Sequence, residues 1–138
     1  MSRVLPFPQA DVFDLVADVE RYPEFLPGWQ AARILRRDGD RLLVDQALGG
    51  MGVRQRFQTR AHLERPERIT IEGDQAPFRR LHQTWEFIPE GEQTTVLRFC
   101  VDYSLRGVLL GRVIDRFCEH VFRETVDAFV RRARARLP

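Results

Sequence analysis

The chain has three histidines and two cysteines, which are the side chains most typical of zinc sites. A zinc site needs several such side chains at close spacing or brought together in pairs. His62, His82 and His120 are widely separated, and Cys100 and Cys118 form no Cys-x-x-Cys pair. We therefore expect no metal site and, because cytosolic proteins keep their thiols reduced, two free cysteines.

Motifs for phosphate binding and nucleophilic catalysis are also missing from the sequence. It contains no P-loop, no Gly-x-Gly-x-x-Gly and no Gly-x-Ser-x-Gly. Ser104 and Cys100 have no neighbouring base that the sequence reveals, and acid–base catalysis needs such a positioned group. We expect a protein that is not an enzyme, with no catalytic residue and no metal or nucleotide cofactor.

Large apolar side chains are concentrated in residues 21–29, Arg-Tyr-Pro-Glu-Phe-Leu-Pro-Gly-Trp. Tyr22, Phe25, Leu26 and Trp29 recur at the spacing of one face of a helix. The first proline suits the opening of such a helix, and the Pro-Gly pair ends it. The stretch predicts a helix of little more than one turn with a large apolar face.

The positions of the apolar residues predict the order of the remaining elements. Residues 2–5 form a short strand and residues 8–19 a helix, whereas residues 29–103 follow a period of two that gives six antiparallel strands. Residues 108–137 form a long helix with a broad apolar stripe. The fold class is therefore α+β, in the order β-α-α-β6-α, with a curved antiparallel sheet around the C-terminal helix. The space between such a sheet and helix is a common ligand site.

Charge and hydropathy limit the partners. The formal net charge is +2, and all 22 cationic residues are arginine. No stretch approaches the roughly 20 apolar residues of a membrane span, and the first residues show no signal-peptide pattern. We expect a cytoplasmic protein, at most peripheral to the inner membrane, with no DNA partner and with its oligomeric state open.

Outward strand positions carry Arg54, Arg56, Arg60 and Arg80. A basic patch of this kind could bind ribosomal RNA or an anionic membrane surface, and an ordinary polar sheet face is the alternative. The arginine-rich residues 131–136 suit the negative end of a helix dipole.

Residues 13–29 resemble the opening of the coenzyme Q-binding proteins, a START-like family within the polyketide cyclase/lipid-transport (SRPBCC) superfamily. Weaker matches follow in residues 76–78, 85–87 and 128–133, so the resemblance spans essentially the whole chain and implies one domain over residues 1–138. The sequence departs from the family at Ala76, where Gly is usual, and at Gly28-Trp29, where Trp-Cys is frequent.

The resemblance implies a helix-grip fold with an internal apolar tunnel, and non-catalytic binding of a polyprenyl quinone such as ubiquinone, or a related lipid, in support of respiration. The short apolar helix would be a lid across one end of the tunnel, with a plug at the core edge as the alternative. Inward polar groups would orient the quinone head. The expected ligand-binding residues are Tyr22, Phe25, Leu26, Trp29, Phe57, Leu81, Gln83, Trp85, Phe99, Tyr103, Ile114, Phe117 and Val121.

Two other functions follow from the same resemblance. The family contains bacterial ribosome-association toxins, which block the joining of the ribosomal subunits, so the large subunit is an alternative partner. The superfamily also contains polyketide aromatase/cyclases, which would need acid–base groups along the tunnel that the sequence does not reveal.

Overall fold

A computed structural model describes residues 1–50, 52–107 and 111–138 of the chain. The chain begins with strand β1 (Ser2–Leu5), helix α1 (Gln9–Ala17) and the 3-10 helix η1 (Val19–Glu24). Six strands follow, and helix α2 (Gly111–Arg136) comes last. The strands are β2 (Trp29–Asp38), β3 (Arg41–Gly50), β4 (Val53–Glu64), β5 (Arg68–Gly73), β6 (Phe78–Pro89) and β7 (Thr95–Leu105).

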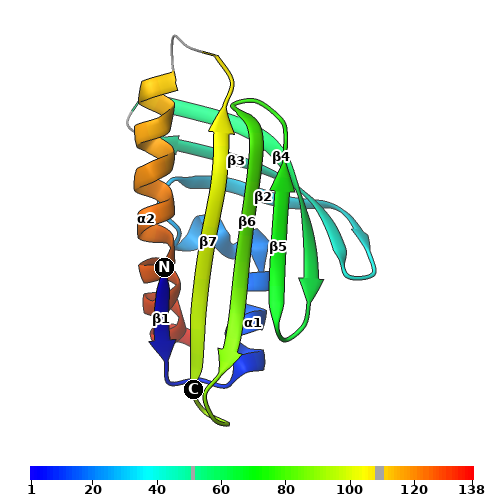
Figure 1. The fold of residues 1–138 in the computed structure, drawn as a ribbon, viewed down its shortest axis with the longest axis vertical. Coiled ribbons are helices and arrows are strands. Elements are labelled where there is room, and N and C mark those ends of the chain that lie inside the picture. Colours follow the sequence, from blue (N-terminus) through cyan, green and yellow to red (C-terminus); the bar gives the residue numbers. More distant parts are fainter. Residues whose placement is uncertain (51, 108–110) are drawn as a thin grey trace.

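The strands form one antiparallel sheet in the order β1-β7-β6-β5-β4-β3-β2. The sheet is strongly curved and encloses the three helices, with α2 running along β7 (Figure 1). This arrangement confirms the predicted α+β class and helix-grip order. It also follows from the sequence pattern, because one face of each central strand is apolar and must be covered.

Burial along β4 and β6 follows the predicted alternation. Phe57, Leu81 and Trp85 are buried on the inner face, while neighbours such as Arg54 and Arg80 are exposed. A strand that is apolar on one face and charged on the other fixes its own register, because a shift of one residue would bury the charges. The sheet therefore presents a defined set of side chains to α2.

Two helix boundaries differ from the sequence-based expectation. Helix α1 ends at Ala17 rather than Val19, because Asp18 leaves the helical region with φ −82° and ψ 67°. The chain then continues as η1, which begins at Val19. The expected start of α2 at Val108 lies outside the described residues.

The interior divides into two halves along α2. At the α1 end, Phe13 and Phe87 meet edge to face with ring centroids 5.1 Å apart. Leu5, Leu97 and Val126 are also almost completely buried. The other half lies between the sheet and the N-terminal part of α2, and it contains a cavity.

Candidate functional site

A largely enclosed cavity lies between the inner face of the sheet and helices α2 and η1. Its volume is about 50 Å³, measured to the centres of water-sized molecules. Since one water occupies roughly 10–15 Å³ on this measure, the cavity has room for a few waters. The structure therefore shows a narrow cavity rather than an open tunnel, and a long ligand would have to displace side chains of the wall.

Most residues predicted from the sequence to bind a ligand lie in this wall. They come from η1 and the segment after it, from strands β4, β6 and β7, and from α2, which the fold brings around one space. Those that line the cavity are Tyr22, Leu26, Trp29, Phe57, Leu81, Gln83, Trp85, Phe99, Ile114, Phe117 and Val121.

Phe25 and Tyr103, which the sequence also predicted to bind the ligand, do not line the cavity. Phe25 follows the end of η1 and is only half-buried, with the guanidinium of Arg132 4.8 Å from its ring centroid. Its ring packs edge to face on that of Phe129, with centroids 5.3 Å apart, so Phe25 contacts a wall residue without lining the cavity itself. Tyr103 packs behind the wall against Phe122 and donates a hydrogen bond to Asp115 Oδ1 at 2.8 Å.

The apolar segment at residues 22–29 packs into the core instead of covering it loosely. The hydroxyl of Tyr22 donates to the carbonyl oxygen of Val16. Its ring meets those of Trp29 and Phe129 edge to face, with centroids 5.9 Å and 5.4 Å apart. These contacts favour the plug over the lid.

Several polar side chains interrupt the apolar wall, and most of them bond to one another. Trp29 Nε1 donates to Gln46 Oε1 at 3.3 Å, and Gln46 Nε2 donates to Thr59 Oγ1 at 2.9 Å. Thr125 donates to the carbonyl oxygen of Val121 at 2.6 Å within α2. These groups are satisfied by the protein and leave little hydrogen-bonding capacity for a ligand.

Gln83 differs from these groups. Its residue is 9% exposed, it lies on β6 between Leu81 and Trp85 on the inner face, and it lines the cavity. Its side-chain amide makes no hydrogen bond to any other described residue. An amide can donate two hydrogen bonds and accept two, so Gln83 offers the cavity an unused polar group.

Two titratable side chains belong to the wall, and both are held protonated. Burial, followed by the charge of Asp18, raises the pKa of Tyr22 far above its usual value. Burial, followed by the charge of Asp115, raises the pKa of Cys118 to about 12. The wall is therefore uncharged at neutral pH.

The sequence reasoning missed several wall residues. Phe78, Phe122 and Phe129 line the cavity, as do Gln46 and Thr59. The alternation in β4 places Thr59 on the same face as Phe57, and a similar reading of β3 would have found Gln46. Phe129 lies on the apolar stripe of α2, so periodicity could identify its face but not its proximity to Tyr22.

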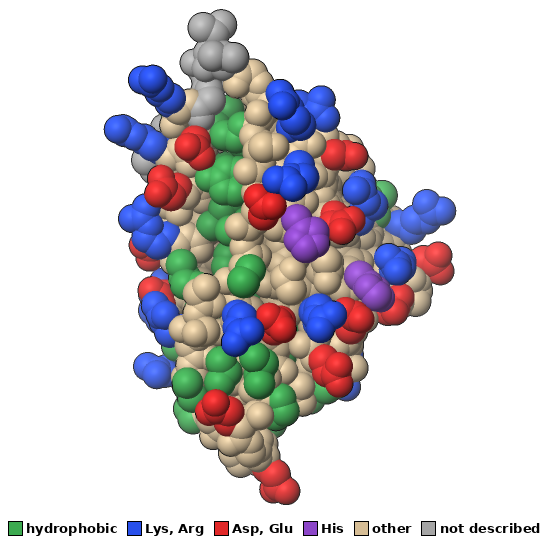
Figure 2. Space-filling model, viewed as in Figure 1, with side chains coloured by type: hydrophobic (Ala, Val, Ile, Leu, Met, Phe, Trp, Pro, Cys, Tyr) green, Lys and Arg blue, Asp and Glu red, His purple; other side chains and the backbone are tan. Residues whose placement is uncertain are grey.

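On the outer face of the sheet, the ion pairs favour an ordinary polar surface over a basic patch. Arg56 pairs with Asp45, while Arg60 and Arg80 lie 3.8 Å and 3.1 Å from carboxylate oxygens of aspartates on the same face. Figure 2 shows basic and acidic side chains interspersed over this surface. Arg54 alone of the four predicted arginines makes no ion pair with a described residue. Three of the four positive charges are therefore locally compensated.

Two of the three histidines lie on the outer face of the sheet, as the alternation of side chains along the strands predicted. His62 and His82 are on the outer face near Asp40 and Glu72, with nitrogen–oxygen distances of 3.0 Å and 3.7 Å. Over residues 1–50, 52–107 and 111–138, the structure shows no group of three or more His, Cys, Asp or Glu side chains that could hold a metal ion. In that same part of the chain, none of the helices is long and apolar enough to span a membrane.

The fold and the cavity define a helix-grip protein with a small apolar chamber between its sheet and its long helix. The model of the family described as polyketide cyclase/dehydrase and lipid transport matches residues 5–130. The chain belongs to this family.

Relatives within the family carry different names. The chain is 32% identical to a ribosome association toxin RatA from Pseudomonas aeruginosa, with 96% of this chain and 92% of that protein covered. It is 26% identical to the mitochondrial coenzyme Q-binding protein COQ10 homolog B from Xenopus laevis, covering 96% of this chain and 56% of that protein. The solved structure of the Zhui aromatase/cyclase from a Streptomyces species is similar in fold, with a TM-score of 0.87 over 100% of this chain and 93% of that one, at 17% identity.

Proposed function

We propose that the protein binds an apolar ligand with a small polar head in the cavity between its sheet and α2, and that a prenylated quinone is a ligand of this kind. The observation that carries the proposal is a cavity wall built mostly of apolar side chains, in which the amide of Gln83 on the inner face of the sheet makes no hydrogen bond to another described residue. The family description, which includes lipid transport, supports the same class of ligand.

The wall determines how such a ligand would lie. Apolar area removed from water contributes roughly 25 cal/mol per Å², so the aromatic and aliphatic surface favours the tail. The Gln83 amide can donate to a carbonyl oxygen of the head, and a hydrogen bond of this kind contributes about 0.5–1.5 kcal/mol. We therefore expect the head to lie beside β6.

Tryptophan fluorescence tests this proposal directly. The chain has two tryptophans, and both Trp29 and Trp85 line the cavity. A short-chain prenylated quinone bound there should quench their emission in a saturable titration. The Gln83→Leu variant should bind the quinone about tenfold more weakly yet bind a prenyl chain without a carbonyl as well as wild type does. Unsaturable quenching by wild type would contradict the proposal.

Association with ribosomes is a second candidate function, and it rests on the relatives named ribosome association toxin. The experiment is sedimentation of the protein with separated ribosomal subunits at low and at physiological salt. If the outer sheet face carried this activity, reversal of Arg54, Arg56 and Arg60 would abolish sedimentation with the large subunit. No co-sedimentation of wild type even at low salt would remove this candidate.

A further inference from the structure

One end of the molecule combines the cavity with a group of arginines. The end of β3, the start of β4, the start of β6, the end of β7 and the start of α2 lie at this end (Figure 1). Arg106 ties two of these segments, because its guanidinium donates to the carbonyl oxygens of Phe78 at 3.0 Å and Asp74 at 2.7 Å. We call this part of the surface the arginine end, and its members are Arg54, Arg79, Arg112 and Arg116.

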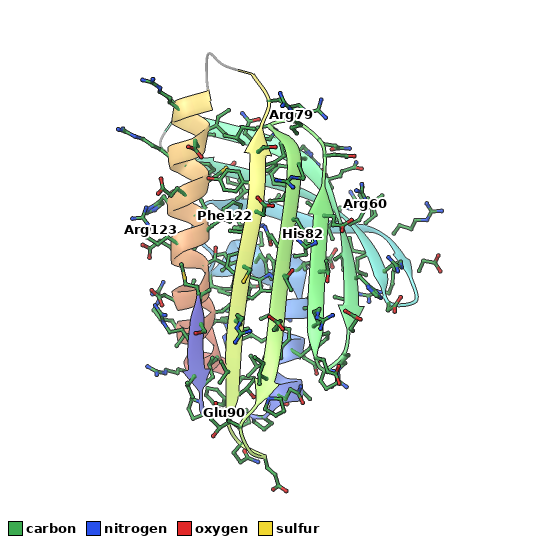
Figure 3. All side chains as sticks on the ribbon, viewed as in Figure 1. Arg60, Arg79, His82, Glu90, Phe122 and Arg123 are labelled. Atoms are coloured by element: carbon green, nitrogen blue, oxygen red, sulfur yellow. The ribbon has the colours of Figure 1, made fainter. Side chains whose placement is uncertain are left out.

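Each member of the arginine end lies within two residues, along the sequence, of a residue that lines the cavity. Arg54 precedes Gln55 and Arg79 follows Phe78, and both of those neighbours line the cavity. Arg112 and Arg116 flank Ile114, which also lines it. Figure 3 shows Arg79 at this end, while Glu90 lies at the opposite tip. The segments that carry these positive charges therefore also carry wall residues of the chamber that we propose as the ligand site.

These arginines are exposed, and none makes an ion pair with another described residue. Of the carboxylates close to them in the chain or fold, Asp74 lies 3.8 Å from Arg60. Asp115, which stands between Arg112 and Arg116, accepts a hydrogen bond from the uncharged hydroxyl of Tyr103. Unpaired arginines also lie on the hairpin of β2 and β3, but Asp38 and Asp40 stand among them in the sequence. At the arginine end, Asp115 stands between two of the four arginines, so most of the positive charge there is left without a neighbouring carboxylate in the sequence.

The helix dipole does not explain Arg112 and Arg116. They lie in the first two turns of α2, where the positive end of the helix dipole disfavours cations. The first turn contains no acidic residue, and like charges four residues apart repel each other weakly. By contrast, Arg134 and Arg136 occupy the last turn, where the dipole favours them.

We propose that the arginine end docks the protein on an anionic membrane surface, so that the cavity faces the bilayer from which its ligand comes. This inference rests on the proposed binding of an apolar ligand. Val113, which is 50% exposed between Arg112 and Ile114, adds an apolar side chain to the cationic group. Cationic and apolar side chains together are typical of surfaces that bind at the membrane interface.

Vesicle sedimentation tests the inference with two matched variants. One changes Arg54, Arg79, Arg112 and Arg116 to Gln, and the other changes Arg60, Arg68, Arg80 and Arg98, each paired with a carboxylate, to Gln. Both remove four positive charges. Each arginine near an anionic surface contributes about a fivefold factor, so the first variant should bind vesicles of phosphatidylcholine and phosphatidylserine at least ~tenfold more weakly. The second should bind nearly as wild type does.

Three further measurements complete the test. Wild type should bind pure phosphatidylcholine vesicles weakly, and added salt should reduce its binding to the anionic ones. The first variant should melt at the same temperature as wild type or higher, and it should still bind a short-chain quinone in solution, which separates docking from the ligand site. Equal loss in both variants would overturn the inference, because net charge would then explain it. Binding of ribosomal RNA but not of vesicles, lost in the first variant, would also overturn it.

Discussion

The two halves of the interior are built from the same kinds of side chain, yet one is packed solid and the other encloses a cavity. In the α1 half, Phe13 and Phe87 meet at 5.1 Å and are 1% and 2% exposed. In the other half, Phe57 and Phe117 are 5% and 4% exposed but face a space of about 50 Å³. The difference is that α1 supplies side chains to the first half, whereas α2 and η1 alone cover the second. Hydrophobic composition therefore does not determine whether an apolar face is filled.

Truncation of a phenylalanine should give the largest difference in unfolding free energy between the two halves. Phe87→Ala in the solid half should lower the free energy of unfolding by about 3–5 kcal/mol, because the neighbours cannot close the new void. Phe117→Ala should cost at least ~1 kcal/mol less, since its ring already borders a cavity and makes fewer contacts. Denaturant unfolding of both variants measures the difference. Equal losses would mean that the second half is packed as tightly as the first.

Enlargement of a small side chain should also separate the two halves, with a smaller difference in unfolding free energy. Ala128 is 2% exposed and does not line the cavity, whereas Cys118 is buried and does. Ala128→Phe should cost about 1–3 kcal/mol or more of unfolding free energy, because a filled core resists added volume. Cys118→Phe should stay within ~1 kcal/mol of wild type in the same denaturant experiment. A comparable loss in Cys118→Phe would contradict the view that its ring has space to enter.

The alkaline stability profile should show the smallest effect. The folded protein holds the Cys118 proton more tightly than the unfolded chain does, because burial and Asp115 raise its pKa from 9.0 to about 12. The stabilisation that this provides is complete below pH 9 and is lost as the pH rises from 9 to 12. Cys118→Ala should therefore flatten the fall in unfolding free energy over this range. Cys100→Ala, at an exposed cysteine, is the matched control and should leave the slope unchanged.

The sequence predicted the elements and the sides of the strands well, because both depend on local periodicity. Phe57 and Trp85 were assigned to the inner face from alternation alone. The sequence did not predict that Phe25 lies outside the cavity wall, because the segment forms a 3-10 helix that ends at Glu24 instead of an α-helix.

Relations between distant residues were harder to predict from the sequence. The pairing of Arg56 with Asp45 depends on the register between β3 and β4, which periodicity does not fix. The narrowness of the cavity depends on how α2 packs over the sheet, so no local pattern could reveal it.

The central claim is that the cavity binds an apolar ligand, and retention of a prenylated quinone tests it most directly. Wild type, Cys118→Phe and Cys100→Phe would each be incubated with the quinone, passed through gel filtration and analysed for bound quinone by native mass spectrometry. Wild type and Cys100→Phe, which carries the same change at an exposed position, should retain one quinone per chain. Cys118→Phe should retain at least ~tenfold less while it stays folded. Equal retention by all three proteins, or none by wild type, would contradict the account.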